Sequence, residues 1–79
     1  MKITIYGHPL CSFCHDAKAL AEEKNFEYDW IDISKNPEKY EEAKAKTGHE
    51  TVPIVFADEE FVGGFTEFHE QVESGKITV

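Results

Sequence analysis

Two cysteines separated by two residues, Cys11 and Cys14, are the side chains of this chain most capable of chemistry. An alternating segment typical of a strand precedes them, and a segment rich in helix formers follows them. A thiol at the start of a helix lies beside unpaired N–H groups and the positive end of the helix dipole, and both favour the reactive thiolate. The spacing also lets Cys14 attack a sulfur that is bonded to Cys11. The pair therefore predicts thiol–disulfide exchange.

Length and charge limit the classes of function. The chain has 79 residues, and we expect residues 1–79 to form one small domain. Sixteen acidic residues face eight lysines and no arginine, so the formal net charge is −8 and no nucleic-acid partner is expected. No apolar run is long enough to cross a bilayer, so no membrane association is expected. The first residues carry no export signal, which predicts a cytoplasmic location where paired cysteines are catalytic or metal-bound.

Hydrophobic patterning predicts the elements that position the cysteines. Strands are expected over residues 2–6, 27–33, 53–57 and 61–62, and helices over residues 12–24, between Asn36 and Gly48, and from a cap at Thr66 to Gly75. A helical crossover makes the first two strands parallel, and a tight turn at residues 58–60 makes the last two antiparallel. The predicted fold is α/β: a βαβ unit, a second helix and a ββα unit, with a four-stranded mixed sheet flanked by three helices.

Three separated motifs occur together: Cys11-Ser12-Phe13-Cys14, Thr51-Val52-Pro53 and Gly63-Gly64. In this order and spacing the chain resembles, over essentially its whole length, the glutaredoxin family of the thioredoxin-like superfamily. The resemblance implies a small dithiol glutaredoxin of phage or bacterial type. Such a protein would use glutathione to reduce protein disulfides or glutathione mixed disulfides, and we expect this chain to be a monomer. The resemblance also implies disulfide-containing protein clients. Ribonucleotide reductase is among the proteins that the family often supplies with electrons.

The resemblance assigns roles to the first two motifs. Cys11 would be the exposed nucleophile, and Cys14 would be the resolving thiol, more buried in the first helix. A cis peptide bond before Pro53 would place the backbone of Thr51 and Val52 beside Cys11. Glutathione would then pair with the Val52 main chain as an added strand.

The remaining ligand contacts are also implied by the resemblance. Gly63 and Gly64 would let the ligand approach the backbone closely, and the helix start at Thr66 and Glu67 would offer N–H groups to a ligand carboxylate. His8 stands where the family often has a lysine or arginine, and it would donate a hydrogen bond. The implied glutathione-binding residues are His8, Phe13, Thr51, Val52, Pro53, Gly64, Phe65, Thr66 and Glu67.

Other interpretations stay open at this point. A redoxin reduced by thioredoxin reductase would share the fold and the cysteines, and an iron–sulfur cluster carrier with glutathione as extra ligand would bind rather than catalyse. The leading interpretation requires no metal, and a structural zinc would need two ligands beyond the cysteines. The segment from Cys11 to His15 also matches the C-x-x-C-H haem pattern, but the only methionine for a second axial ligand is Met1. His49 and His69 are expected to be solvated surface residues.

Overall fold

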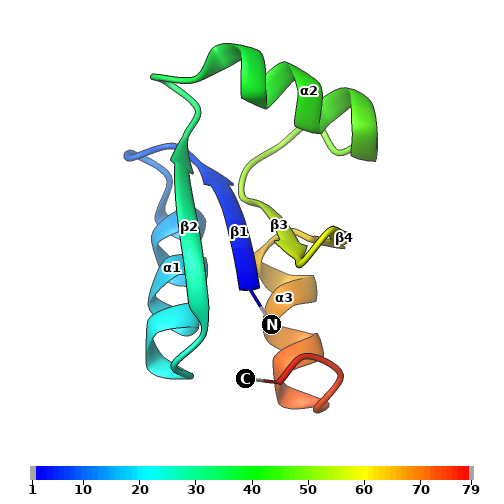
Figure 1. Cartoon of the computed structure of the whole chain (residues 1–79). Helices are drawn as coiled ribbons and strands as arrows, with labels where there is room; N and C mark the ends of the chain where they lie inside the picture. The colour runs from blue at the N-terminus through cyan, green and yellow to red at the C-terminus, as the bar shows by residue number, and fades with distance from the viewer. Residues whose placement is uncertain (1, 79) are drawn as a thin grey trace.

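The central strand of the sheet is the strand that leads to the cysteines. The computed structural model describes residues 2–78, with a sheet of order β2-β1-β3-β4 (Figure 1). The elements in chain order are β1 (Lys2–Gly7), α1 (Ser12–Glu23), β2 (Glu27–Asp32), α2 (Pro37–Thr47), β3 (Ile54–Ala57), β4 (Glu60–Gly63) and α3 (Phe65–Glu73). β1 pairs with β2 in parallel and with β3 antiparallel, and β4 pairs antiparallel with β3. The predicted α/β fold is confirmed.

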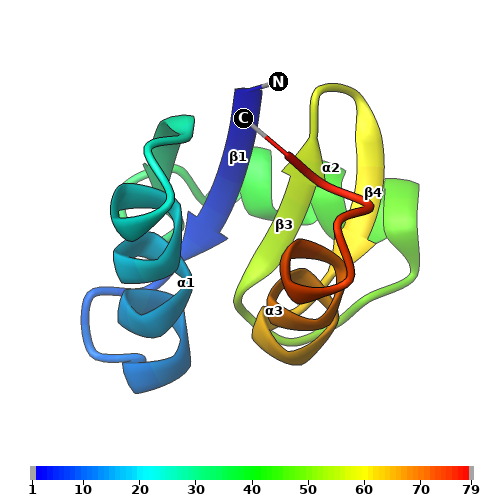
Figure 2. The same ribbon diagram turned by 90° about the horizontal axis from the view of Figure 1, so that it is seen from below.

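Alternation along β1 and β3 divides the core between the two faces of the sheet. Figure 2 shows α1 and α3 side by side on one face, with α2 beyond the other. On the opposite face, Ala43 of α2 packs against Ile54 and Phe56 of β3. The larger cluster lies under α1 and α3, and its fully buried members are Ile3, Ile5, Ala17, Ala21, Val55 and Phe68. None of the described helices has the length and apolar character that a membrane span requires.

The first two helices begin and end close to their predicted limits. α1 starts directly after Cys11 and ends at Glu23, and Asn25 beyond it has a φ of 61°, the left-handed conformation expected of a terminator. α2 starts at Pro37, whose fixed φ and missing N–H suit the first turn. Gly48 ends α2 with a φ of 73°.

The third helix begins earlier than the sequence predicts. Gly64 is its cap residue, and the expected cap Thr66 is the exposed second residue of α3. The reason is a local contact: the Glu67 carboxylate accepts a hydrogen bond from the Gly64 N–H at 2.8 Å. A carboxylate three residues after the cap residue satisfies a donor that would otherwise have no partner.

Where the strand ends differ from the predicted ends, they differ by one residue. β2 ends one residue early at Asp32, and β3 begins at Ile54 because Pro53 has no N–H for the ladder. β1 extends to Gly7, where a side chain would not fit. A Cβ there would lie 2.6 Å from the Trp30 ring and 3.0 Å from the Cβ of Cys14.

Candidate active site

Cys11 lies at the cap position of α1, where β1 has ended and the helix begins. Its Sγ accepts a hydrogen bond from the backbone N–H of Cys14 at 3.2 Å. The same sulfur lies 3.9 Å from the carbonyl oxygen of Val52. Cys11 is half-buried, whereas Cys14 is completely buried. A substrate can therefore reach Cys11, and an N–H donor is in place for negative charge that develops on its sulfur.

Burial gives the second cysteine a different chemistry. Desolvation, followed by the hydrogen bond to Cys11, raises the pKa of the Cys14 thiol from 9.0 to about 12, although a hydrogen bond from the backbone of His8 lowers it in part. Cys14 is thus a neutral thiol near neutral pH. It must lose its proton before it can attack another sulfur.

A hollow of about 200 Å³ opens beside Cys11, between the loop before β3 and the start of α3. The Val52–Pro53 peptide bond in this loop is cis, as predicted. Phe13 is 59% exposed and stacks on Phe65 with ring centroids 6.2 Å apart, so these two rings form one wall. The lining residues are Phe13, His49, Thr51, Val52, Pro53, Gly64, Phe65, Thr66 and Glu67.

The glycine pair lies where the backbone and the Glu67 side chain come closest. Gly63 has a φ of 134°, and a Cβ on it would lie 2.7 Å from the Oε1 of Glu67. A Cβ on Gly64 would lie 3.6 Å from the carbonyl oxygen of Pro53. Glycine is therefore required at residue 63, and at residue 64 it keeps the floor of the hollow open.

A half-exposed thiol above a buried thiol, beside a loop with a cis proline, suits disulfide exchange. A sequence profile of the glutaredoxin family matches residues 3–62. The chain belongs to the glutaredoxin family. Glutaredoxins are thiol–disulfide oxidoreductases that use glutathione as co-substrate and act on disulfide-containing proteins, so this glutaredoxin is a redox oxidoreductase.

Individual relatives agree with this assignment. Glutaredoxin 1 of Escherichia coli (strain K12) is 36% identical over 75 residues, which cover 86% of this chain and 88% of that protein. The structure of reduced Escherichia coli glutaredoxin superimposes with a TM-score of 0.82 at 34% identity and covers 96% of this chain and 98% of that chain. The glutaredoxin-like NrdH-redoxin of Escherichia coli, a protein with a thioredoxin-like activity profile, gives a TM-score of 0.75 at 33% identity, over 85% of this chain and 87% of its own.

One residue implied by the sequence lies apart from the hollow. The structure brings eight of the nine implied glutathione contacts to its lining, and His8 is the exception. The imidazole Nδ1 of His8 accepts a hydrogen bond from the N–H of Leu10 at 3.0 Å, so the ring turns back onto its own loop. In this glutaredoxin the loop before Cys11 therefore uses His8 for its own turn.

His49, expected to be a solvated residue, is half-buried in the lining of the glutaredoxin hollow. The expectation was wrong because nothing in the local sequence shows that the turn after α2 lies against β4 and α3. His69 agrees better with the expectation: it is exposed on α3, where its Nε2 lies 3.7 Å from a carboxylate oxygen of Glu73. For His49, the only local indication of a place in the hollow was its position two residues before Thr51.

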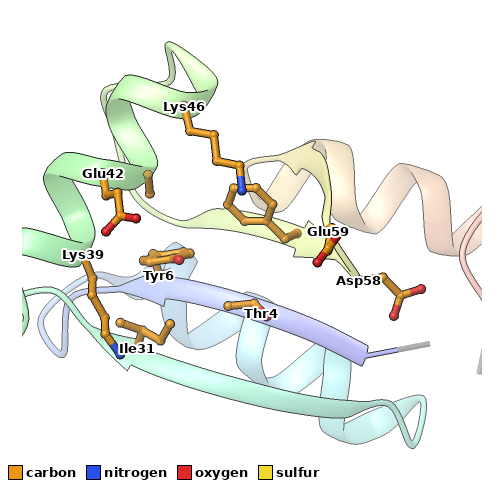
Figure 3. Close-up of a pocket in the computed structure, with 10 residues that line it drawn as sticks. Thr4, Tyr6, Ile31, Lys39, Glu42, Lys46, Asp58 and Glu59 are labelled. Atoms are coloured by element: carbon orange, nitrogen blue, oxygen red, sulfur yellow. The ribbon is translucent and has the colours of Figure 1, made fainter.

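A second hollow of about 300 Å³ lies between α2 and the opposite face of the sheet (Figure 3). Tyr6 and Thr4 of β1 point into it, together with Lys46 of α2. Val52, whose carbonyl oxygen lies beside the Cys11 sulfur, does not line this hollow, so the hollow lies apart from the two cysteines. Within residues 2–78, no three His, Cys, Asp or Glu side chains gather as metal ligands.

Proposed function

We propose that this glutaredoxin catalyses the glutathione-dependent reduction of protein disulfides and glutathione mixed disulfides through Cys11 and Cys14. One observation carries the proposal. The half-buried Sγ of Cys11 lies 3.9 Å from the carbonyl oxygen of Val52, which lines an open hollow, while Cys14 is buried. An attacking thiolate, a docking edge and a second thiol are thus in one place.

Glutathione would bind by main-chain pairing with Val52, as an extended peptide pairs with the edge of a sheet. One of its carboxylates would lie at the start of α3. The Gly64 N–H is already bonded to the Glu67 side chain, so the backbone N–H groups of residues 65–67 are the donors in the first turn that remain for the ligand. The stacked Phe13 and Phe65 would cover the apolar part of the ligand.

The oxidative half of the cycle starts at Cys11. Its thiolate attacks one sulfur of the client disulfide, forms a mixed disulfide and expels the other client sulfur as a thiolate. Cys14 then loses its proton and attacks the Sγ of Cys11. This step releases the client as a dithiol and leaves a Cys11–Cys14 disulfide.

Two glutathione molecules complete the reductive half. The first glutathione thiolate attacks Cys11 and expels Cys14, so glutathione becomes bonded to Cys11. The second attacks the sulfur of the bound glutathione and expels the Cys11 thiolate, which gives oxidised glutathione. Two electrons pass from two glutathione thiols to one client disulfide. We place this cycle in the cytoplasm, as a monomer, with ribonucleotide reductase as a candidate client.

A second candidate is a redoxin reduced by thioredoxin reductase. The likeness to NrdH-redoxin, a glutaredoxin-like protein with a thioredoxin-like activity profile, supports it. The two candidates share the exchange chemistry of Cys11 and Cys14 and differ only in the reductant that opens the disulfide. An iron–sulfur carrier is not proposed, because no group of metal ligands among the described residues favours it.

The decisive experiment traps the mixed disulfide. Cys14→Ser protein incubated with oxidised glutathione should gain one glutathione on Cys11, measured by mass spectrometry, and the matched Cys11→Ser protein should gain none. Wild-type turnover is then compared with two reductants: glutathione with glutathione reductase, and thioredoxin reductase alone. Turnover only with thioredoxin reductase, and no adduct in Cys14→Ser, would replace the first candidate with the second.

A further inference from the structure

His49 is held at the rim of the hollow by contacts from three directions. Its backbone N–H donates to the Oγ1 of Thr47 at 3.1 Å, and its ring packs on Phe61 with centroids 5.6 Å apart. The Nε2 lies 3.4 Å from the Oγ1 of Thr51. It would also lie 3.7 Å from a Cβ placed on Gly64. This nitrogen therefore faces the start of α3, where a substrate carboxylate would bind.

The charges around the hollow make His49 distinctive. Among the nine described lining residues it is the only base, and Glu67 of α3 is the only acid. Glu50, the next residue in the chain, is exposed, and the Cys11 sulfur lies near the Val52 end of the hollow. An anionic tripeptide that enters this site meets one side chain able to carry a positive charge.

The lysines of the preceding helix do not supply that charge. The Nζ of Lys44 lies 3.0 Å from a carboxylate oxygen of Glu41. The Nζ of Lys46 lies 5.6 Å from the centroid of the Phe56 ring, over the hollow on the opposite face of the sheet (Figure 3). The turn at Gly48 lies between these lysines and His49. Of these three side chains, only His49 lines the hollow beside Cys11.

We propose that His49 is a specificity-determining residue of the glutathione site: its Nε2 donates a hydrogen bond to the ligand carboxylate that lies at the start of α3. The inference rests on the proposed function, since it concerns the same hollow. Histidine changes charge between about pH 5 and about pH 8, and a protonated donor binds a carboxylate more strongly than a neutral one. A glutathione site with a histidine donor should therefore bind its anionic ligand more tightly at low pH than at high pH.

The test measures binding apart from the redox chemistry. The protein is a Cys11→Ser/Cys14→Ser variant, which removes both thiols from the titration, and the probe is S-methylglutathione, whose own thiol is blocked. Calorimetric titrations are run at about pH 5.5 and about pH 8, toward the two ends of the range in which histidine changes charge. The dissociation constant should be about three- to tenfold smaller at the lower pH.

Matched variants assign the effect to His49. His49→Gln keeps a neutral N–H donor and should bind with similar affinity at both pH values, whereas His49→Leu should bind more weakly than His49→Gln. His69→Gln, a change at the histidine outside the hollow, should retain the full pH dependence. Urea denaturation of each variant verifies that the fold is intact.

The outcomes separate the two proposals. The role of His49 would be overturned if the parent protein bound S-methylglutathione equally well at both pH values. It would also be overturned if His49→Gln kept the full pH dependence. Either result would leave the proposed glutathione site intact. A parent that binds no S-methylglutathione at either pH would overturn the proposed glutathione site, and the role of His49 with it.

Discussion

The backbone N–H of Cys14 donates to the Sγ of Cys11 at 3.2 Å, so the accessible and the buried sulfur are coupled within one turn of α1. The contact does two things at once. It places a donor on the sulfur that gains and loses negative charge during exchange. It also fixes Cys14 one helical turn away, at the distance from which its own thiolate reaches Cys11.

Selective labelling should distinguish the two cysteines. Burial raises the pKa of Cys14 to about 12, so at about pH 7.5 well under about 0.1% of it is thiolate. Iodoacetamide should modify Cys11 and leave Cys14 unmodified in the native reduced protein, as measured by peptide mass spectrometry. Both should react after unfolding in urea. Equal rates at the two cysteines in the native protein would contradict the assignment of the nucleophile.

The resolving step should depend on pH with a defined slope. Burial, the largest cause of the raised pKa of Cys14, does not depend on the charge of Cys11, so in the mixed disulfide the thiolate fraction of Cys14 should still rise about tenfold per pH unit below its pKa. Release of glutathione from Cys11 by Cys14 should therefore accelerate about tenfold per unit between about pH 6 and about pH 9. Quenched-flow measurements of free glutathione report the rate of its release from Cys11. The Cys14→Ser variant is the control that should not release glutathione. A flat profile would show that Cys14 is already ionised in the mixed disulfide.

The contact between Glu67 and Gly64 should stabilise the start of α3. Glu67→Ala removes the acceptor of the Gly64 N–H and should lower the free energy of unfolding by about 1–2 kcal/mol. Glu67→Gln keeps an oxygen acceptor and loses only the charge beside the helix dipole, so its loss should be about 0.3–1 kcal/mol. Urea denaturation measures both. Glu70→Ala, on the exposed part of the same helix, is the matched control, and a loss as large as in Glu67→Ala would refute the capping role.

Gly63 should tolerate substitution less well than another glycine with positive φ. Gly63 has a φ of 134°, and a Cβ there would lie 2.8 Å from the Cβ of Glu67. Gly75 has a φ of 80° and no atom within 4 Å of an added Cβ. Gly75→Ala should cost about 1 kcal/mol from the backbone alone, and Gly63→Ala should cost about 2–3 kcal/mol or prevent folding. Similar midpoints in urea for the two variants would show that β4 moves to relieve the contact.

Several features followed from local sequence and were confirmed. The alternation around Ile3 and Ile5 predicted β1, and the cysteine pair after it was correctly placed at the start of a helix. The Thr51-Val52-Pro53 motif predicted a cis bond beside Cys11, and the structure has one there. These features depend on residues a few positions apart or on a family resemblance, so the order of residues along the chain is sufficient to predict them.

Other features depended on which distant segments meet. The sequence by itself determined the elements, the reactive pair and the family, because propensity, capping and spacing act over a few residues. Only the tertiary structure decided that His8 turns onto the Leu10 N–H and that His49 lies in the hollow. The turn after α2 lies beside Phe61 of β4 and Gly64 before α3. The pairing of β3 with β4 and the packing of α3 bring these segments together. Such contacts depend on the packing of the whole sheet, which no short stretch of sequence specifies.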